Sequence, residues 1–373
     1  MPIFTDSAIR SEIEFGLNLL RQQNLSEPLV FSPFSISLCV SLLHAAATGK
    51  TRDEIREALL KNSTDEEFEE YFSELLKTVL KSRDYIEVNM ANHVFCVMKH
   101  PIKRSYLDTV EKLYNAGATA LDFKDKVQAS DTMNKFVTEA TRGHILKIIT
   151  PEQFEQGFVA LFTNALYFKA DWCWPFQAVK TQKSDFHTSS ESKRSIDFMI
   201  RNPLEGLKLY SQNDQFEMLQ LPYSCTDDES SFAMNIFLPK KRFGLKDALF
   251  KLTPAIIHSL LTNTKKAYCH VKIPKWEIGT NMSLNKALQT IGINLALEKY
   301  KEEFKELADN MNARIKVDEK GTTPAEREPL RIHAGLRFHA GLRQPKLIEF
   351  YANHPFLFIL TKGTHPIFMG IYC

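Results

Sequence analysis

The order of helix-type and strand-type patterns is the feature that most restricts how this chain can fold. Up to about residue 145, apolar residues recur three and four positions apart, which is the helical period; the clearest segments are 9–22, 36–47 and 65–80. Most later segments are short runs of β-branched and aromatic residues, typical of strands; these are 158–168, 270–278, 312–319 and 354–360. Helices first and strands later favour an α+β layered fold over an alternating parallel sheet. Because segment 158–168 is apolar on both faces, we expect it to be a central strand.

The composition predicts a globular protein with one large core. The 373 residues are 44% hydrophobic, and no Pro/Gly/Ser-rich linker or composition shift marks a boundary, so we expect a single domain over residues 1–373. Lys and Arg (47) are scattered among Asp and Glu (45), which argues against a nucleic-acid partner. The run PKKR at 239–242 could be a nuclear address, but a solvated turn is favoured.

The N-terminal segment and the cysteines bear on the expected location. Asp6, Glu12 and Glu14 stand where a secretory signal would need an unbroken apolar core, and no segment is long and apolar enough to span a bilayer. The six cysteines form no CxxC pair, which predicts reduced thiols; they are Cys39, Cys96, Cys173, Cys225, Cys269 and Cys373. We therefore expect a cytoplasmic or nucleocytoplasmic protein with no membrane partner.

No motif in the sequence points to catalysis, a metal or a cofactor. GxSxG, HExxH and GxGxxG are all missing from the chain, so we expect no enzyme. His333 and His339 are about 20 Å apart in an extended chain, too far to share one ion. We predict no metal and no cofactor.

A near-duplicated hexamer lies close to the C-terminus. LRIHAG at 330–335 is followed by LRFHAG at 336–341 and then by Leu342 and Arg343. A duplication changes the spacing of every residue that follows it. It is therefore tolerated mainly in an exposed loop, whose backbone has no fixed partners.

Eight phrases follow one another along the chain: PLVFSPFSISLCVSLLHAAATGKTRDEI (28–55), MNKFVTEATRGHILKII (133–149), LFTNALYFKADWCWPF (161–176), LQLPY (219–223), FAMNIFLP (232–239), VKIPKWEI (271–278), FYANHPFLFIL (350–360) and IFMG (367–370). Taken together and in this order they resemble the serpin family, with Phe136 where the family has tryptophan. The resemblance implies three β-sheets covered by about eight or nine helices, with an exposed reactive-centre loop at about 320–348. It also implies a monomer that inhibits a serine protease as a suicide substrate, through insertion of the cleaved loop into the main sheet, which is a recognised form of β-strand addition. Since many family members are secreted, an extracellular location is the alternative.

The resemblance also assigns the parts of the loop. Its hinge corresponds to Glu319, Lys320, Gly321, Thr322, Thr323 and Pro324. Counting forward from the hinge places the scissile bond near Gly335–Leu336, whereas counting backward from the strand after the loop places it near the second repeat copy. The candidate residues are therefore Gly335, Leu336, Arg337, Leu342 and Arg343. Arg337 and Arg343 are the residues that a trypsin-like protease would choose, because its specificity pocket holds an acidic group. The alternative is that both arginines only keep the loop soluble.

Two departures from the family pattern leave a second function open. If Thr322 points inward, alternation places Pro324, Glu326 and Glu328 on the buried face of an inserted strand, and Pro329 follows. Proline cannot donate to a central ladder and a buried carboxylate is costly, so insertion should be slow and a non-inhibitory cleavable substrate, chaperone or binding protein is the alternative.

The second departure concerns the residues where the main sheet opens. The resemblance assigns this sheet-opening cluster to Ser32, Ser35, Asn164, Met311 and Trp172. Met311 stands where the family usually has histidine, and a thioether accepts hydrogen bonds only weakly. Opening of the sheet is therefore expected to differ from the family pattern, unless the alignment slips here.

Overall fold

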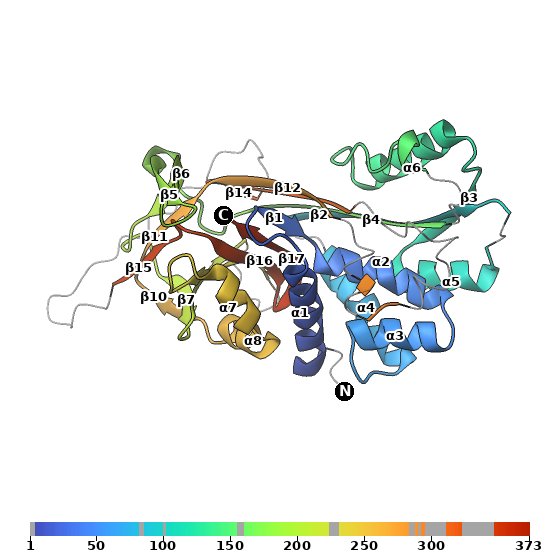
Figure 1. Cartoon of the computed structure of the whole chain (residues 1–373), viewed down its shortest axis with the longest axis horizontal. Helices are drawn as coiled ribbons and strands as arrows, with labels where there is room; N and C mark the ends of the chain where they lie inside the picture. Colours follow the sequence, from blue (N-terminus) through green and yellow to red (C-terminus); the bar gives the residue numbers. More distant parts are fainter. Residues whose placement is uncertain are drawn as a thin grey trace.

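The computed structural model of the chain describes residues 4–81, 86–99, 102–154, 160–223, 231–282, 288–289, 292–294, 311–322 and 347–373. In these ranges eight α-helices pack against three β-sheets (Figure 1), which confirms the predicted α+β fold. The helices are α1 (Asp6–Arg21), α2 (Pro33–Ala46), α3 (Lys50–Leu59), α4 (Asp65–Leu80), α5 (Arg104–Tyr114), α6 (Lys126–Ala140), α7 (Leu245–Lys251) and α8 (Pro254–Thr262).

The six-stranded sheet runs along the upper side of the molecule in Figure 1. Its strands, in order, are β12 (Trp276–Met282), β13 (Met311–Val317), β14 (Gly321–Thr322), β4 (Ala160–Asp171), β2 (Ile86–Val97) and β3 (Gly117–Leu121). The prediction that 158–168 forms a central strand is confirmed, because β4 lies between β14 and β2. The long antiparallel register of β4 with β2 places Asn164 opposite Asn92.

The other two sheets are adjacent to one end of the first. The seven-stranded sheet has the order β1 (Leu29–Phe31), β17 (His365–Tyr372), β16 (Phe356–Lys362), β9 (Phe232–Pro239), β8 (Phe216–Pro222), β7 (Lys208–Gln212) and β10 (Lys265–Ala267). The four-stranded sheet has the order β15 (Ile348–Tyr351), β11 (Cys269–Pro274), β6 (Lys193–Arg201) and β5 (Gln182–His187). Two short 3-10 helices, η1 (Pro151–Gln153) and η2 (Ala178–Lys180), complete the elements.

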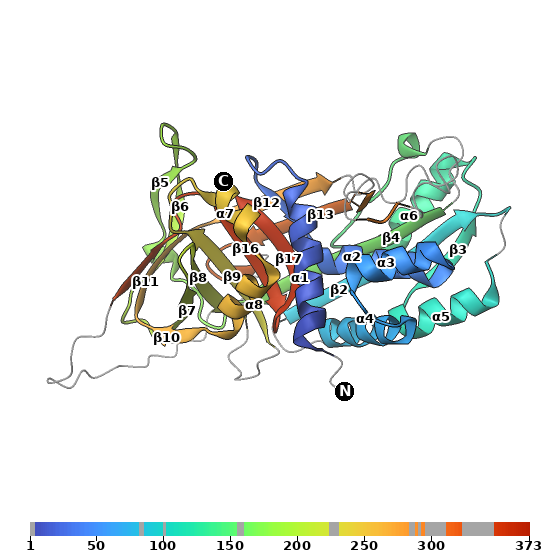
Figure 2. The ribbon, with the colours of Figure 1, turned by 60° about the horizontal axis from the view of Figure 1, so that its bottom comes forward.

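Helix α2 occupies the centre of the molecule. Twelve of its fourteen residues are buried, as expected for a helix that is apolar nearly all round. It packs against β4 and β17, so it lies under the six-stranded sheet, while α6 covers the opposite face (Figures 1 and 2). None of the helices in the described ranges combines the length and the apolar character needed to cross a membrane.

Two expectations about strands need correction. Segment 270–278 is not one strand: β11 ends at Pro274 and β12 begins at Trp276 in a different sheet, because the chain changes sheets at a proline that cannot donate to a ladder. Strands β2 and β3 also lie inside the first 145 residues, which the periodicity assigns mainly to helices. Burial of β2 does not alternate, so it lacks the period-two signal of a half-buried strand.

The described cysteines divide into two groups. Cys39, Cys96, Cys269 and Cys373 are free, as expected, but Cys173 is disulfide-bonded, and for that residue the prediction of a reduced thiol is wrong. Sequence spacing does not reveal which distant positions the fold brings together, so a pair without a CxxC motif leaves no signal.

Gly370 provides a test of packing between β1, β17 and β16. An added Cβ at Gly370 would stand 2.4 Å from the carbonyl oxygen of Leu29 and 2.3 Å from the ring of Phe358. We expect Gly370→Ala to lower the free energy of unfolding by about 3 kcal/mol, because backbone and ring cannot both move away. Gly143→Ala is the control: nothing lies within 4 Å there, so only its positive φ should cost, about 1 kcal/mol. Equal losses in urea unfolding of the two variants would show that crowding at Gly370 does not cause the destabilisation.

Candidate functional site

Strand β14 joins the two halves of the six-stranded sheet. Its residue Thr322 lies opposite Val317 of β13 and opposite Ala170 of β4, and Gly321 lies opposite Asp171. Among the described residues β13 and β4 are not direct neighbours, and β14 is the only strand between them. We call residues 318–322, with the side chains around them, the hinge site.

A tight turn leads from β13 into β14. The Asp318 carboxylate accepts hydrogen bonds from the backbone N–H groups of Lys320 (2.9 Å) and Gly321 (3.3 Å), the arrangement by which aspartate favours turns. Gly321 then passes so close to β4 that an added Cβ would be 2.0 Å from the Ala170 carbonyl oxygen and 2.7 Å from Asp171 Cα. Only glycine fits at this position without displacing β4.

Thr322 is anchored in an aromatic stack beneath the sheet. Its side chain is 2% exposed, and its hydroxyl lies 2.5 Å from the Tyr223 hydroxyl. The Tyr223 ring stacks on Trp172 at 4.5 Å, and the Trp172 indole N–H donates to the Asp318 carbonyl (2.8 Å). The Trp172 backbone N–H donates to the Lys320 carbonyl (2.7 Å). Burial strongly raises the pKa of Tyr223, more than the Thr322 hydrogen bond lowers it, so this phenol stays protonated.

Glu319 fixes the outer side of the same turn. Its carboxylate accepts from the Thr181 hydroxyl (2.7 Å) and pairs with the Lys275 ammonium (2.8 Å), and its carbonyl accepts from the Phe176 N–H (2.8 Å). Partial burial alone would raise the pKa of Glu319, but the hydrogen bonds from Lys275 and Thr181 outweigh it and hold the pKa below its ordinary value. The charged carboxylate of Glu319 therefore links the hinge site to Thr181 and Lys275, which adjoin strands β5 and β11 of the four-stranded sheet.

A second polar cluster links α2 to the middle of the six-stranded sheet. The Ser32 hydroxyl caps α2 by accepting from the Ser35 N–H (3.0 Å) and donates to the Ile367 carbonyl (2.6 Å). The Ser35 hydroxyl donates to the Asn164 side-chain oxygen, and the Asn164 amide donates to Asn92 of β2. Strand β4 is thereby tied both to the helix below it and to its neighbour in the sheet.

The structure brings together three of the five residues assigned to the sheet-opening cluster, namely Ser32, Ser35 and Asn164. Trp172 belongs to the hinge site instead, since it directly follows β4 and lies eight residues beyond Asn164, about 26 Å in an extended chain. Met311 stands six residues before Val317, as Asn164 stands six before Ala170, so both are level on the strands that flank β14; the Met311 side chain lies outside the described residues. Sequence reasoning missed Asn92, which only the β2–β4 register reveals.

The remaining predicted residues lie outside the described ranges. These are the hinge residues Thr323 and Pro324 and the bond candidates Gly335, Leu336, Arg337, Leu342 and Arg343, with His333, His339, Glu326, Glu328 and Pro329. Their assignments stay predictions. What the structure does describe is where the segment 323–346 is attached: it leaves from β14 in the six-stranded sheet and returns at β15, the edge strand of the four-stranded sheet.

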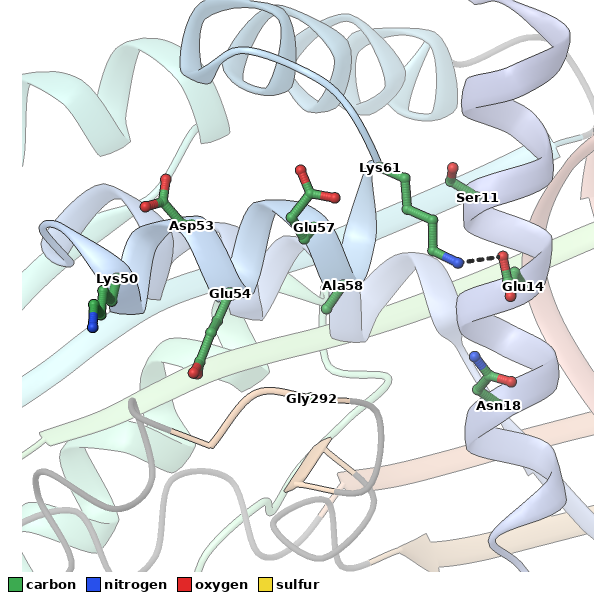
Figure 3. A pocket seen from close by; sticks show the side chains of 10 residues that line it. All are labelled: Ser11, Glu14, Asn18, Lys50, Asp53, Glu54, Glu57, Ala58, Lys61 and Gly292. Carbon is green, nitrogen blue, oxygen red and sulfur yellow. Dashed lines mark hydrogen bonds and ion pairs between the residues drawn. The ribbon is translucent and has the colours of Figure 1, made fainter.

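A pocket of about 510 Å³ lies between α1 and α3 (Figure 3). Its charged side chains do not converge: Asp53 and Glu57 point away from Glu54 in Figure 3, and Lys61 pairs with Glu14 (2.9 Å). No group of metal-ligating side chains occurs among the described residues. The pocket therefore offers no set of groups that could act together on one ligand, and the hinge site is the stronger candidate.

Comparison with known proteins identifies the family. The family described as serpin (serine protease inhibitor) matches residues 10–373, and the chain belongs to it. This is a family of protease-inhibitor-type proteins and not of enzymes. Serpins target serine proteases, so serine proteases are the class of partner that the family has.

Relatives and solved structures agree over nearly the whole chain. Serpin-ZX of Arabidopsis thaliana is 28% identical over 384 aligned positions, covering 97% of this chain and 96% of that protein. The structure of Arabidopsis AtSerpin1 in its native stressed conformation has a TM-score of 0.82 at 24% identity, covering 100% and 98%. Human thyroxine-binding globulin complexed with its ligand has the same TM-score at 19% identity, covering 99% and 98%. At these identities the two structures show a shared fold.

The ion pair between Glu319 and Lys275 predicts that the free energy of unfolding depends on pH. A depressed pKa in the folded state stabilises the protein above the ordinary value of 4.5, and this contribution is lost as the pH falls through the lower folded-state value. We expect Glu319→Gln to reduce the free energy of unfolding at pH 7 by less than about 1 kcal/mol. The difference from the unaltered protein should shrink as the pH falls below 4.5.

Urea unfolding across a pH series measures this difference. Glu191→Gln, in the exposed turn between β5 and β6, is the control and should follow the unaltered protein at every pH. A Glu319→Gln difference that is the same at neutral pH and in strong acid would show that the ion pair is not its cause.

Proposed function

We propose that this serpin inhibits a serine protease as a suicide substrate, with β14 as the preformed start of the strand that inserts. The protease serine attacks the carbonyl carbon of the scissile bond, forms an ester with the reactive-centre loop and releases a new amino terminus. The loop on the β14 side is then free to continue between β13 and β4. The protein acts as a monomer, and no metal or cofactor is required.

The observation that carries this proposal is the placement of Gly321 and Thr322. Thr322 is already buried against Tyr223 and paired with both β13 and β4. A strand that continues from Thr322 would inherit this register, because alternation along a strand is fixed once one residue is placed. Insertion would thus be an elongation of an existing ladder, which avoids the cost of starting a new one.

The residues that the protease would recognise follow from the chemistry of the reactive-centre loop. Arg337 and Arg343 each follow a leucine in the repeated hexamer, and a guanidinium pairs in two-pronged fashion with the carboxylate in a trypsin-like specificity pocket. We assign the reactive bond to this region, with Gly335–Leu336 as the competing position. The target is accordingly a protease that cleaves after arginine.

One observation favours a second function. The buried side chain of Thr322 supports the premise that Pro324, Glu326 and Glu328 would face inward in an inserted strand, where proline and unpaired carboxylates are unfavourable. The fold does not decide the matter, since thyroxine-binding globulin, a ligand-bound protein, shares it. A non-inhibitory role as a cleavable substrate, chaperone or binding protein is therefore the second candidate.

Mixing the protein with trypsin at equal molarity separates the two candidates. A denaturant-stable complex on gels, with mass spectrometry placing the ester at one loop residue, is expected for the inhibitor. Cleavage that leaves trypsin fully active would rule out inhibition of this enzyme and favour the second function.

The hinge sequence predicts a gain of function. Replacing Pro324, Glu326 and Glu328 together with alanine should raise the rate of trypsin inhibition and the yield of complex at least about tenfold if insertion is limiting, because each carboxylate costs more than about 1 kcal/mol to bury. Thr323→Ala with Arg327→Ala is the matched control, since alternation places both on the outer face. An equal effect of the two variants on stopped-flow inhibition rates would show that the inward positions are not the ones that limit insertion.

A further inference from the structure

A cationic turn and helix form a distinct surface on the far side of the molecule from the hinge. Residues 240–251 contain five cations and one carboxylate, Asp247, although the whole chain carries a net charge of only +2. The five cations are Lys240, Lys241, Arg242, Lys246 and Lys251, and all are exposed. Figure 1 shows α7 and β14 at opposite sides of the molecule. A partner bound at α7 would leave the hinge site unobstructed.

The turn presents an aromatic side chain at its tip. The Gly244 N–H donates to the Lys241 carbonyl (2.9 Å) and closes the turn, and Phe243 occupies its third position with φ of 60°. This left-handed conformation suits glycine or asparagine and is unfavourable for a bulky residue. Phe243 is nevertheless 38% exposed, with the Arg242 guanidinium 5.7 Å from its ring centre. An unfavourable backbone conformation at an exposed aromatic residue motivates a functional hypothesis for this turn.

The exposed face of α7 continues the same chemistry. Leu245 and Leu249, four residues apart, are buried, whereas Phe250 is 58% exposed between Lys246 and Lys251. Residues spaced by four lie on one helix face, so Lys246 and Phe250 share a face. Asp247 and Lys251 are the neighbouring exposed pair. The segment thus carries two exposed phenylalanines, Phe243 directly after Arg242 and Phe250 directly before Lys251, and soluble surfaces expose few such rings without a functional need.

We propose that residues 240–251 are a docking surface for an anionic phospholipid membrane. Charge complementarity supplies the attraction, since each Lys or Arg near an anionic leaflet strengthens binding, and Phe243 and Phe250 would enter the boundary between headgroups and acyl chains. This is contact with a membrane surface and involves no membrane-spanning helix. It changes the expectation of no membrane partner.

A membrane fits this surface better than a linear polyanion does. Residues 240–243 are four successive exposed positions that lead into the turn closed by Gly244. Single-stranded nucleic acids are instead held in a groove that follows the backbone. An exposed turn that carries an aromatic ring can enter an interface but cannot enclose a chain.

Sedimentation with vesicles tests the proposal on the full chain. The vesicles are phosphatidylcholine alone or with about one third phosphatidylserine, and a sulfated polysaccharide and a single-stranded DNA serve as soluble polyanions. We expect binding to the phosphatidylserine vesicles only. Replacing Lys240, Lys241 and Arg242 with glutamine should weaken it about a hundredfold.

Two further variants separate surface binding from general effects. Phe243→Asn accepts a left-handed backbone, so it should unfold no earlier than the unaltered protein yet bind vesicles several-fold more weakly. Lys77→Gln with Arg104→Gln and Lys135→Gln removes three exposed cations elsewhere (63%, 81% and 76% exposed) and should leave vesicle binding unchanged.

Three outcomes would overturn the proposal. They are no binding to phosphatidylserine vesicles, an equal loss of binding in the two charge variants, and binding to soluble polyanions with none to vesicles. The last outcome would assign the surface to a polyanion instead.

Discussion

In the part of the chain that the structure describes, β13 and β4 are joined through the two residues of β14. Gly321 can pass close to the β4 backbone because it has no side chain, and Thr322 is held by the Tyr223 hydroxyl beneath it. Trp172 braces both the ring of Tyr223 and the turn before Gly321. In the proposed mechanism, so short a strand is lengthened at one end and the rest of the sheet keeps its pairing. The cluster around Asn164 holds the next level of the sheet to α2 and β2.

The same constraint accounts for the two candidate functions. Once Thr322 faces inward, every second residue after it is committed to the buried face of an elongated strand. The residues at those positions are unfavourable for burial, whereas Gly321 and Thr322 are themselves buried. If the proposed insertion takes place, the balance between cleavage and insertion depends on how much it costs to bury these residues. The cationic surface at α7 lies apart from the hinge site (Figure 1), so the proposal for that surface does not depend on this balance.

Part of this structure could be predicted from the residues and part could not. The helices α1, α2 and α4 follow from apolar residues at helical spacing, and β4 follows from a run that is apolar on both faces. Strand β2 could not be recognised in the same way, because its buried pattern is irregular, and the break between β11 and β12 depends on which sheet each half joins. At the site, the resemblance supplied Ser32, Ser35 and Asn164. Asn92 and the bonded state of Cys173 depend on residues that are distant in sequence, and only three-dimensional pairing brings them together.

The midpoint of thermal unfolding, measured before and after cleavage in the reactive-centre loop, would show whether β14 elongates. A protease that cuts within 330–343 would free the segment after β14 to lengthen that strand between β13 and β4. Several new ladder hydrogen bonds, at about 1 kcal/mol each, should raise the midpoint of thermal unfolding by on the order of 10 °C. An unchanged or lower midpoint after complete cleavage would mean that β14 does not elongate and that the hinge site is not the start of an inserting strand.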